Sequence, residues 1–219
     1  MQLLLLLLTL LSNIVSYTVD PALVRLYWKD DKGQALGSLQ HLKEHVEHQH
    51  KQLLFAMNGG MFKPDGIPVG LFIQDQVTIT PLDTSSGNGN FYLKPNGVLY
   101  ITTDNKASIC QTSAFVNHSV KFATQSGPML LIDGVIHPAF KQGSTNLNIR
   151  NGVGILPDGR LVFAMSKEGI NFYDFALYFK QLGCRNALYL DGFVSRTYLP
   201  AENWIQTDGN FAVIIGVTK

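Results

Sequence analysis

Short apolar runs separated by turn-forming residues fill most of this chain. Asp133-Gly134 and Pro157-Asp158-Gly159 each separate two such runs, and Pro95-Asn96-Gly97 stands between the runs 90–93 and 98–101. Asn-Gly and Asp-Gly dipeptides between apolar runs favour tight hairpins of antiparallel strands. The pattern therefore predicts a fold built mainly from short strands, with hairpins at these three turns.

Two segments show helical periodicity instead. The first covers 38–51, where apolar residues recur on one helical face and Ser38 can serve as N-cap. The second begins after Asn171, which can cap it, and ends at Gly183. No repeat or linker is found after the first 20 residues. The predicted fold class is α+β: a single strand-rich domain in which two main helices pack on a mixed sheet.

The N-terminus resembles a signal peptide. Residues 3–8 are six consecutive leucines, a run far shorter than the roughly 20 residues that cross a bilayer. We expect a signal peptide over 1–16, with Ser16 before the cleavage site, and one domain over 17–219. The protein would then be exported to the periplasm or the extracellular space, without stable membrane insertion once the peptide is removed. The alternative is an incorrectly assigned start or a first core strand.

Charge and apolar content exclude two classes of protein. Lys and Arg number 17 against 16 Asp and Glu, a net charge of +1, and 46% of residues are hydrophobic. Disordered chains are less apolar than this. Nucleic-acid binding through phosphates needs a marked cationic excess. We therefore expect a small-molecule or glycan partner and no nucleic acid.

Four histidines crowd into ten residues of the first predicted helix, at positions 41, 45, 48 and 50. Histidines one helical turn apart can hold a transition metal. These four, however, lie away from the apolar face, so a solvated helix surface is the favoured interpretation. We expect no metal and no cofactor. Of the two cysteines, Cys184 follows a helix-ending glycine and is interpreted as a small buried residue.

Two polar segments could bind a ligand. Asn58-Gly59-Gly60 follows an apolar run, and glycines there can bring backbone amides close to a ligand. The alternative is an Asn-Gly hairpin turn, although no strand follows immediately. Arg150 is a lone cation among polar and glycine residues, suited to bidentate binding of a carboxylate or phosphate. The alternative is an ordinary surface arginine.

Two carboxylates are candidates for catalysis. Asp191 follows the fully apolar run 187–190, which is typical of a strand covered on both faces. A carboxylate at a buried strand end lies in a medium of low dielectric constant that can shift its pKa. The alternative is one more Asp-Gly turn. Glu168 is the best second carboxylate, with a surface acid on a loop as its alternative.

Five motifs in this order resemble the phosphodiester glycosidase family, over nearly all of the chain after its N-terminus. They are Asn58-Gly59-Gly60-Met61-Phe62, Ser126-Gly127-Pro128, Arg150-Asn151-Gly152-Val153-Gly154, Ser166 before a helix, and Asp191-Gly192-x-x-Ser195. The chain is most similar to short bacterial members without appended domains. It departs from the family pattern at Phe193 and Val194, where glycines are common, so the sugar specificity of other members does not carry over.

The resemblance implies an exported hydrolase that cleaves a glycosyl phosphodiester, a sugar 1-phosphate ester, or a related glycoside. Ordinary glycosidases use two carboxylates, one of which protonates the leaving oxygen. A departing phosphate needs less protonation and more charge stabilisation. The implied catalytic residues are Asp191, Arg150 and Glu168, and the implied substrate-binding residues are Asn58, Gly59, Gly60, Ser126, Asn151, Ser166 and Ser195.

A second interpretation belongs to a different class of protein. The bulky Phe193 and Val194 would narrow or reshape the pocket. A non-catalytic glycan-binding module of the cell envelope, which keeps the pocket without turnover, is therefore the alternative. Catalytic turnover that depends on Asp191 would distinguish the enzyme from the module.

Overall fold

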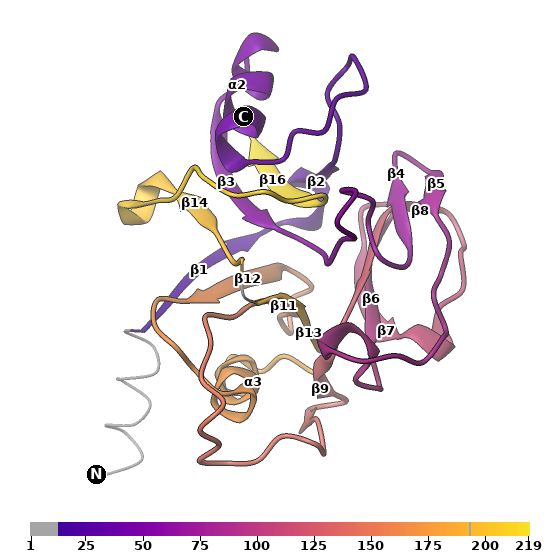
Figure 1. Ribbon diagram of the computed structural model, residues 1–219, viewed down its shortest axis with the longest axis vertical. Helices are drawn as coiled ribbons and strands as arrows, with labels where there is room; N and C mark the ends of the chain where they lie inside the picture. The colour runs from indigo at the N-terminus through magenta and orange to yellow at the C-terminus, as the bar shows by residue number, and fades with distance from the viewer. Residues whose placement is uncertain (1–12, 193) are drawn as a thin grey trace.

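The computed structural model describes residues 13–192 and 194–219. It confirms the predicted fold class, because two helices and many short strands form a single α+β domain (Figure 1). The strand pairs in the described residues are all antiparallel and form three sheets, where one mixed sheet was expected. Tight turns between consecutive strands account for much of this antiparallel pairing.

The first sheet consists, in spatial order, of β1 (Ile14–Val19), β12 (Leu161–Ser166), β11 (Asn151–Ile155), β13 (Ala187–Asp191), β9 (Met129–Ile132) and β10 (Val135–Ile136). The second sheet consists of β15 (Trp204–Ile205), β14 (Thr197–Leu199), β3 (Leu53–Asn58), β16 (Ile214–Thr218) and β2 (Val24–Tyr27). The third consists of β5 (Val77–Thr80), β4 (Phe72–Gln74), β8 (Val120–Ser126), β6 (Gly97–Thr102) and β7 (Ala107–Gln111). The described residues also form four single-turn 3₁₀ helices: η1 (Pro21–Leu23), η2 (Asn90–Tyr92), η3 (Thr112–Ala114) and η4 (Pro200–Glu202).

The main hydrophobic core is shared by the three sheets. Phe55 of β3 stacks on Phe163 of β12 at a centroid distance of 5.4 Å, which joins the first two sheets. Leu99 of β6 and Leu188 of β13 belong to the same buried cluster. Each fully buried side chain of this size stabilises the fold by about 1.5–3 kcal/mol. The shared core holds the ends of strands from different sheets in fixed relative positions.

Both predicted helices are confirmed, and each covers the outer face of one sheet. Helix α2 (Leu39–His48) packs on the second sheet, and α3 (Phe172–Gln181) packs on the first, at the opposite end of the view in Figure 1. Ser38 caps α2 by accepting a hydrogen bond from the His41 amide at 3.1 Å. Asn171 caps α3 in the same way through the Asp174 amide at 2.9 Å.

Strand β11 contains glycines that allow α3 to approach closely. A Cβ at Gly154 would lie 2.7 Å from both the Phe179 ring and the Cys184 sulfur, and a Cβ at Gly152 would lie 3.2 Å from the Phe175 ring. Larger residues would therefore push the helix off the sheet. Cys184 is buried and its thiol is free, as expected for a small core residue.

The hairpin predicted at Pro95-Asn96-Gly97 is wrong. Residues 90–92 form η2 instead of a strand, while β6 pairs with β7 and β8. The Asn96 side chain is buried and donates to the Phe91 carbonyl oxygen at 2.9 Å, and the backbone carbonyl of Asn96 accepts from the Thr112 amide at 3.0 Å. These contacts tie the segment to its neighbours, so it does not turn back on itself. The turns at 133–134 and 157–159 do connect hairpins.

The N-terminal boundary of the fold precedes the expected cleavage site. Strand β1 begins at Ile14 and pairs with β12, with Ser16 opposite Ala164. Residues 1–12 of the expected signal peptide lie outside the described residues, so the peptide stays a prediction. No helix within the described part of the chain is long and apolar enough to cross a membrane.

Candidate active site

Three strand ends from two sheets meet at one place. Strand β3 ends at Asn58, β11 begins at Asn151, and β13 ends at Asp191. Asn151 lies opposite Asp191 at a register shift between β11 and β13. Such irregularities can re-aim side chains at the edge of a regular ladder. The shared core thus brings together three polar residues that are far apart in the chain.

Hydrogen bonds connect these three residues into one network. Asn151 donates through Nδ2 to both the backbone oxygen and Oδ1 of Asn58, at 2.8 and 3.0 Å. Asn58 donates through Nδ2 to the Asp191 carboxylate at 3.2 Å, and the Asp191 amide donates to Oδ1 of Asn151 at 2.7 Å. Both asparagines are fully buried. The network therefore fixes the orientation of the carboxylate.

Burial makes the Asp191 carboxylate unusually weak as an acid. Desolvation raises its pKa to about 6, against hydrogen bonds from the Gly192 amide and the Asn58 side chain that lower it. The Gly192 amide donates to Oδ1 at 2.7 Å. Neither donor is a cation, so burial outweighs the hydrogen bonds. A carboxylate with this pKa can exchange a proton near neutral pH.

Two serines fix the loop that follows β13. Ser195 donates through Oγ to the carbonyl oxygens of Gly192 and Asp191, at 2.8 and 3.2 Å. Ser126, at the end of β8, donates to the Leu190 carbonyl oxygen at 2.7 Å. Both hydroxyl groups are therefore bonded to backbone, and their contribution here is to hold Asp191 in place. Of the two bulky residues in this loop, Val194 packs against the cluster under α2, whereas Phe193 lies outside the described residues.

Arg150 is buried and bound to protein groups. Its Nε donates to the Ile170 carbonyl oxygen at 2.8 Å, and its Nη2 donates to the Asn146 carbonyl oxygen at 3.0 Å. The guanidinium lies 3.6 Å from the centre of the Phe172 ring, and the residue is only 1% exposed. Ser166 accepts from the Arg150 amide at 3.0 Å. Arg150 and Ser166 thus fix the segment before Asn151, and no hydrogen bond joins the Arg150 side chain to the three-residue network.

The two glycines after Asn58 serve close packing. The Gly59 amide donates to the Val213 carbonyl oxygen at 2.8 Å, so it is already bonded within the protein. A Cβ at Gly59 would collide with Ile215, and one at Gly60 would lie 2.7 Å from Oγ1 of Thr124. This explains why no side chain is tolerated where β3 leaves the sheet.

Glu168 lies apart from the network. It is exposed on the loop between β12 and α3, two residues beyond Ser166. No hydrogen bond or ion pair links it to another described residue. The structure thus brings Asn58, Asn151 and Asp191 together, whereas Glu168 is on the surface.

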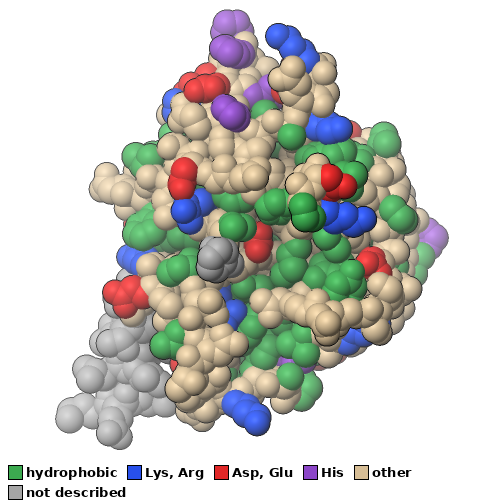
Figure 2. All heavy atoms as spheres, viewed as in Figure 1, with side chains coloured by type: hydrophobic (Ala, Val, Ile, Leu, Met, Phe, Trp, Pro, Cys, Tyr) green, Lys and Arg blue, Asp and Glu red, His purple; other side chains and the backbone are tan. Residues whose placement is uncertain are grey.

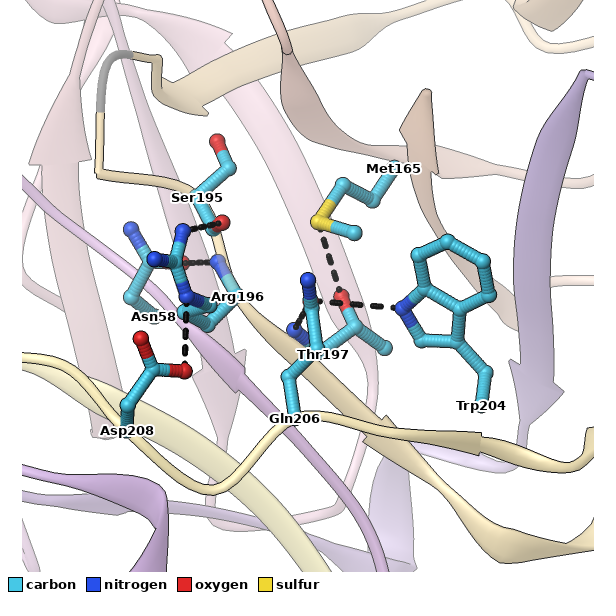
Figure 3. Close-up of polar contacts among 8 residues, drawn as sticks. All are labelled: Asn58, Met165, Ser195, Arg196, Thr197, Trp204, Gln206 and Asp208. Atoms are coloured by element: carbon cyan, nitrogen blue, oxygen red, sulfur yellow. Dashed lines mark hydrogen bonds and ion pairs between the residues drawn. The ribbon is translucent and has the colours of Figure 1, made fainter. Parts of the chain in front are cut away.

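Sequence reasoning missed two residues beside the network. Tyr189 is buried within the apolar strand, and a Cβ on Gly192 would collide with its hydroxyl group. Burial raises the pKa of Tyr189 to about 12, so the hydroxyl stays protonated. Arg196 follows Ser195 directly, and its amide donates to Oδ1 of Asn58 at 2.9 Å (Figure 3). The sequence held a signal for each: Tyr189 carries a hydroxyl group within an otherwise apolar strand, and Arg196 is a cation directly after the motif that ends at Ser195.

The histidine-rich helix presents a solvated surface. Histidine side chains gather at one end of the molecule, where α2 lies (Figures 1 and 2). His41 bonds through Nδ1 to the Leu36 carbonyl oxygen at 2.7 Å. Nε2 of His45 lies 3.1 Å from Nε2 of the Gln49 side chain. The ring nitrogens thus have separate partners. Among residues 13–192 and 194–219, no three His, Cys, Asp or Glu side chains are grouped to hold a metal ion.

Comparison with known proteins identifies relatives by sequence. A family model described as phosphodiester glycosidase matches residues 51–217. The uncharacterized protein YigE of Escherichia coli strain K12 is 40% identical over 191 residues, which cover 85% of this chain and 74% of YigE.

Solved structures share the fold at low sequence identity. The zebrafish N-acetylglucosamine-1-phosphodiester alpha-N-acetylglucosaminidase catalytic domain, auto-inhibited by its pro-peptide, matches with a TM-score of 0.64 at 15% identity and covers 94% of this chain and 82% of that one. A hypothetical protein from Synechocystis matches with a TM-score of 0.56 at 14% identity, covering 94% of this chain and 59% of its own.

Proposed function

This chain belongs to the phosphodiester glycosidase family, and we propose that it is a hydrolase that cleaves a glycosyl phosphodiester or a related glycoside. One observation carries the proposal: a half-buried carboxylate, Asp191, is oriented by two buried asparagines at the meeting point of three strands. Sites of this kind, with a raised pKa and fixed hydrogen-bond geometry, are typical of catalytic carboxylates.

The proposed reaction breaks the bond between the anomeric carbon and the phosphate oxygen. The bonding electron pair leaves with the phosphate, water supplies the new oxygen on the sugar, and the water proton ends on the phosphate monoester or in solvent. The anomeric carbon acquires positive charge in the transition state. An ionised Asp191 would stabilise that charge, directly or as a nucleophile or base. Product stereochemistry separates the nucleophile, which retains configuration, from direct attack by water.

Location and substrate follow from the same proposal. The substrate is a small-molecule or glycan phosphodiester, and the enzyme works outside the cytoplasm, in the periplasm or the extracellular space. The leucine-rich N-terminus supports export. The zebrafish relative, an N-acetylglucosamine-1-phosphodiester alpha-N-acetylglucosaminidase by name, makes α-N-acetylglucosaminyl phosphodiesters the first substrates to test.

The test compares two Asp-Gly turns. Purified wild-type protein, Asp191→Asn and the matched control Asp158→Asn are assayed on α-N-acetylglucosaminyl phosphodiesters and on a panel of aryl glycosides. We expect turnover by wild type and Asp158→Asn, and a loss of about 1,000-fold or more in Asp191→Asn. The wild-type kcat/KM should rise as pH rises through about 6, because ionised Asp191 is the active form. Background release by all three proteins on every substrate would contradict the proposal.

A glycan-binding module is the second candidate, on account of the bulky Phe193 and Val194 that follow Asp191-Gly192 in the sequence. It predicts saturable binding of a glycan without product formation. Turnover that Asp191→Asn abolishes excludes it.

A further inference from the structure

A phosphodiester substrate requires a cation on the side of the leaving group. Its phosphate carries one negative charge before cleavage and gains another when the electron pair arrives. Arginine is suited to this charge because its guanidinium presents several donors in a planar fork. Arg150 is the arginine that the family resemblance implies, but its guanidinium is buried, stacked on Phe172 and bonded to two backbone carbonyl groups.

Arg196 lies at the same site with its charge accessible. Its backbone amide binds Oδ1 of Asn58, the side chain whose Nδ2 binds Asp191. One buried amide group therefore fixes the position of both the carboxylate and the residue that carries the cation. The side chain of Arg196 is 34% exposed, whereas Arg150 is 1% exposed.

The Arg196 guanidinium has donors to spare. Its Nη1 donates to the Ser195 carbonyl oxygen at 3.0 Å, and its Nε donates to Asp208 at 2.7 Å. Figure 3 shows the ion pair between the guanidinium and Asp208. Its Nη2 makes no hydrogen bond to a described residue, and a guanidinium has five N–H groups in all. Asp208 is 63% exposed, so it can release the guanidinium to an anionic ligand.

We propose that Arg196 is the anion-binding residue of this site: its guanidinium binds the phosphate group of the substrate, and Asp208 is the counter-ion that the phosphate replaces. The proposal rests on the proposed function and adds the group that distinguishes charged phosphodiesters from neutral glycosides. Arg150 then holds the segment before Asn151 in place, and the phosphate lies on the Arg196 side of Asn58.

Two substitutions of opposite effect test this assignment. Arg196→Gln and Asp208→Asn are compared with wild type and with a control, Arg185→Gln. The control removes an exposed arginine that is paired with Asp133 at 3.0 Å and precedes β13, at the end of that strand away from Asp191. For each protein, kcat/KM is measured on an α-N-acetylglucosaminyl phosphodiester and on a neutral aryl α-N-acetylglucosaminide. The kcat/KM on the phosphodiester divided by the kcat/KM on the neutral glycoside isolates recognition of the phosphate charge.

We expect Arg196→Gln to lower this ratio about 30-fold, as for the loss of a charged hydrogen bond. Asp208→Asn should raise the ratio, because the phosphate no longer competes with a carboxylate, and Arg185→Gln should leave it unchanged. If Arg196 only supports the loop through Asp208, both substitutions lower activity on the two substrates alike. That result, or an unchanged ratio in Arg196→Gln, overturns the proposal.

Binding of inorganic phosphate separates this proposal from the proposed function. Titrations followed by NMR should give a Kd that Arg196→Gln raises about 10-fold or more and Arg185→Gln does not change. If the wild type hydrolyses neither substrate, the proposed function fails, and the phosphate titration alone decides on Arg196. Equal phosphate binding by wild type and Arg196→Gln overturns the anion site.

Discussion

Strand β11 has an Asp-Gly dipeptide near each end, and the two have different chemistry. Beyond its last residue, Asp158 and Gly159 form the exposed turn to β12. Beside its first residue, Asp191 and Gly192 end the neighbouring strand β13. Asp158 accepts from Nε of Arg160 at 2.8 Å. Asp191, at the centre of the candidate active site, accepts only from amide groups among the residues that the structure describes.

The same dipeptide therefore gives carboxylates of opposite acidity. Hydrogen bonds from Arg160 lower the pKa of Asp158, whereas burial raises the pKa of Asp191 to about 6. An amide orients a carboxylate without neutralising it, so the cost of burial is only partly compensated. The difference lies in what packs around each turn. It can be tested by changing the surroundings of each carboxylate in turn.

Among substitutions in the surroundings of the two carboxylates, the largest effect is expected from Asn58→Ala. The substitution removes the acceptor of the Arg196 amide and the donor to Asp191 together. We expect kcat/KM to fall about 100-fold because the carboxylate loses its orientation. Unfolding free energy should fall by about 2–4 kcal/mol, since buried polar groups lose their partners. The pH at which activity reaches half its maximum should also rise, because a hydrogen bond that lowers the pKa of Asp191 is gone.

Asn96→Ala is the matched control for this change. Asn96 is also buried, and its side chain donates to the Phe91 carbonyl oxygen, away from Asp191. It should lose stability without the shift in the pH profile. Equal pH profiles for Asn58→Ala and the wild type would show that Asn58 does not control the carboxylate.

A smaller effect is expected in the pH dependence of stability. Because the folded protein holds the Asp191 proton up to a pH of about 6, whereas the unfolded chain releases it near the ordinary value of 3.8, ionised Asp191 destabilises the fold. Unfolding free energy should therefore fall by about 2 kcal/mol as pH rises from 4 to 7, relative to Asp191→Asn. Denaturant unfolding at several pH values measures this. Parallel curves for the two proteins would contradict a raised pKa.

The comparison also shows what a sequence can predict. Helix caps at Ser38 and Asn171 and the covered strand before Asp191 depend on neighbouring residues, and they are confirmed. The hairpin predicted at Pro95-Asn96-Gly97 is wrong, because contacts distant in sequence, from the Thr112 and Met129 amides, determine the path of that segment. Local pattern therefore predicted most elements.

The residues of the candidate active site also fall into those that local sequence pattern predicts and those that depend on distant contacts. Strand ends that carry motif residues predicted Asn58, Asn151 and Asp191, which do meet. The burial of Arg150 depends on Phe172, which lies 22 positions further along the chain, and no local pattern shows it. The same holds for Arg196, whose place beside Asn58, 138 positions away, arises only when β14 pairs with β3.

The smallest effect is expected at the exposed end of β11. Arg160→Gln removes the side-chain partner of Asp158 but keeps the backbone amide of residue 160, which contributes most to lowering the pKa of Asp158, so this pKa should rise only part of the way to its ordinary value, as an NMR titration can show. Stability near neutral pH should not change measurably, because ion pairs between exposed side chains are screened by solvent. Activity should not change either, since this turn lies at the end of β11 away from Asp191. A loss of activity in Arg160→Gln would mean that the two ends of β11 are coupled through the strand, and the contrast between the two carboxylates would then no longer be one of local surroundings.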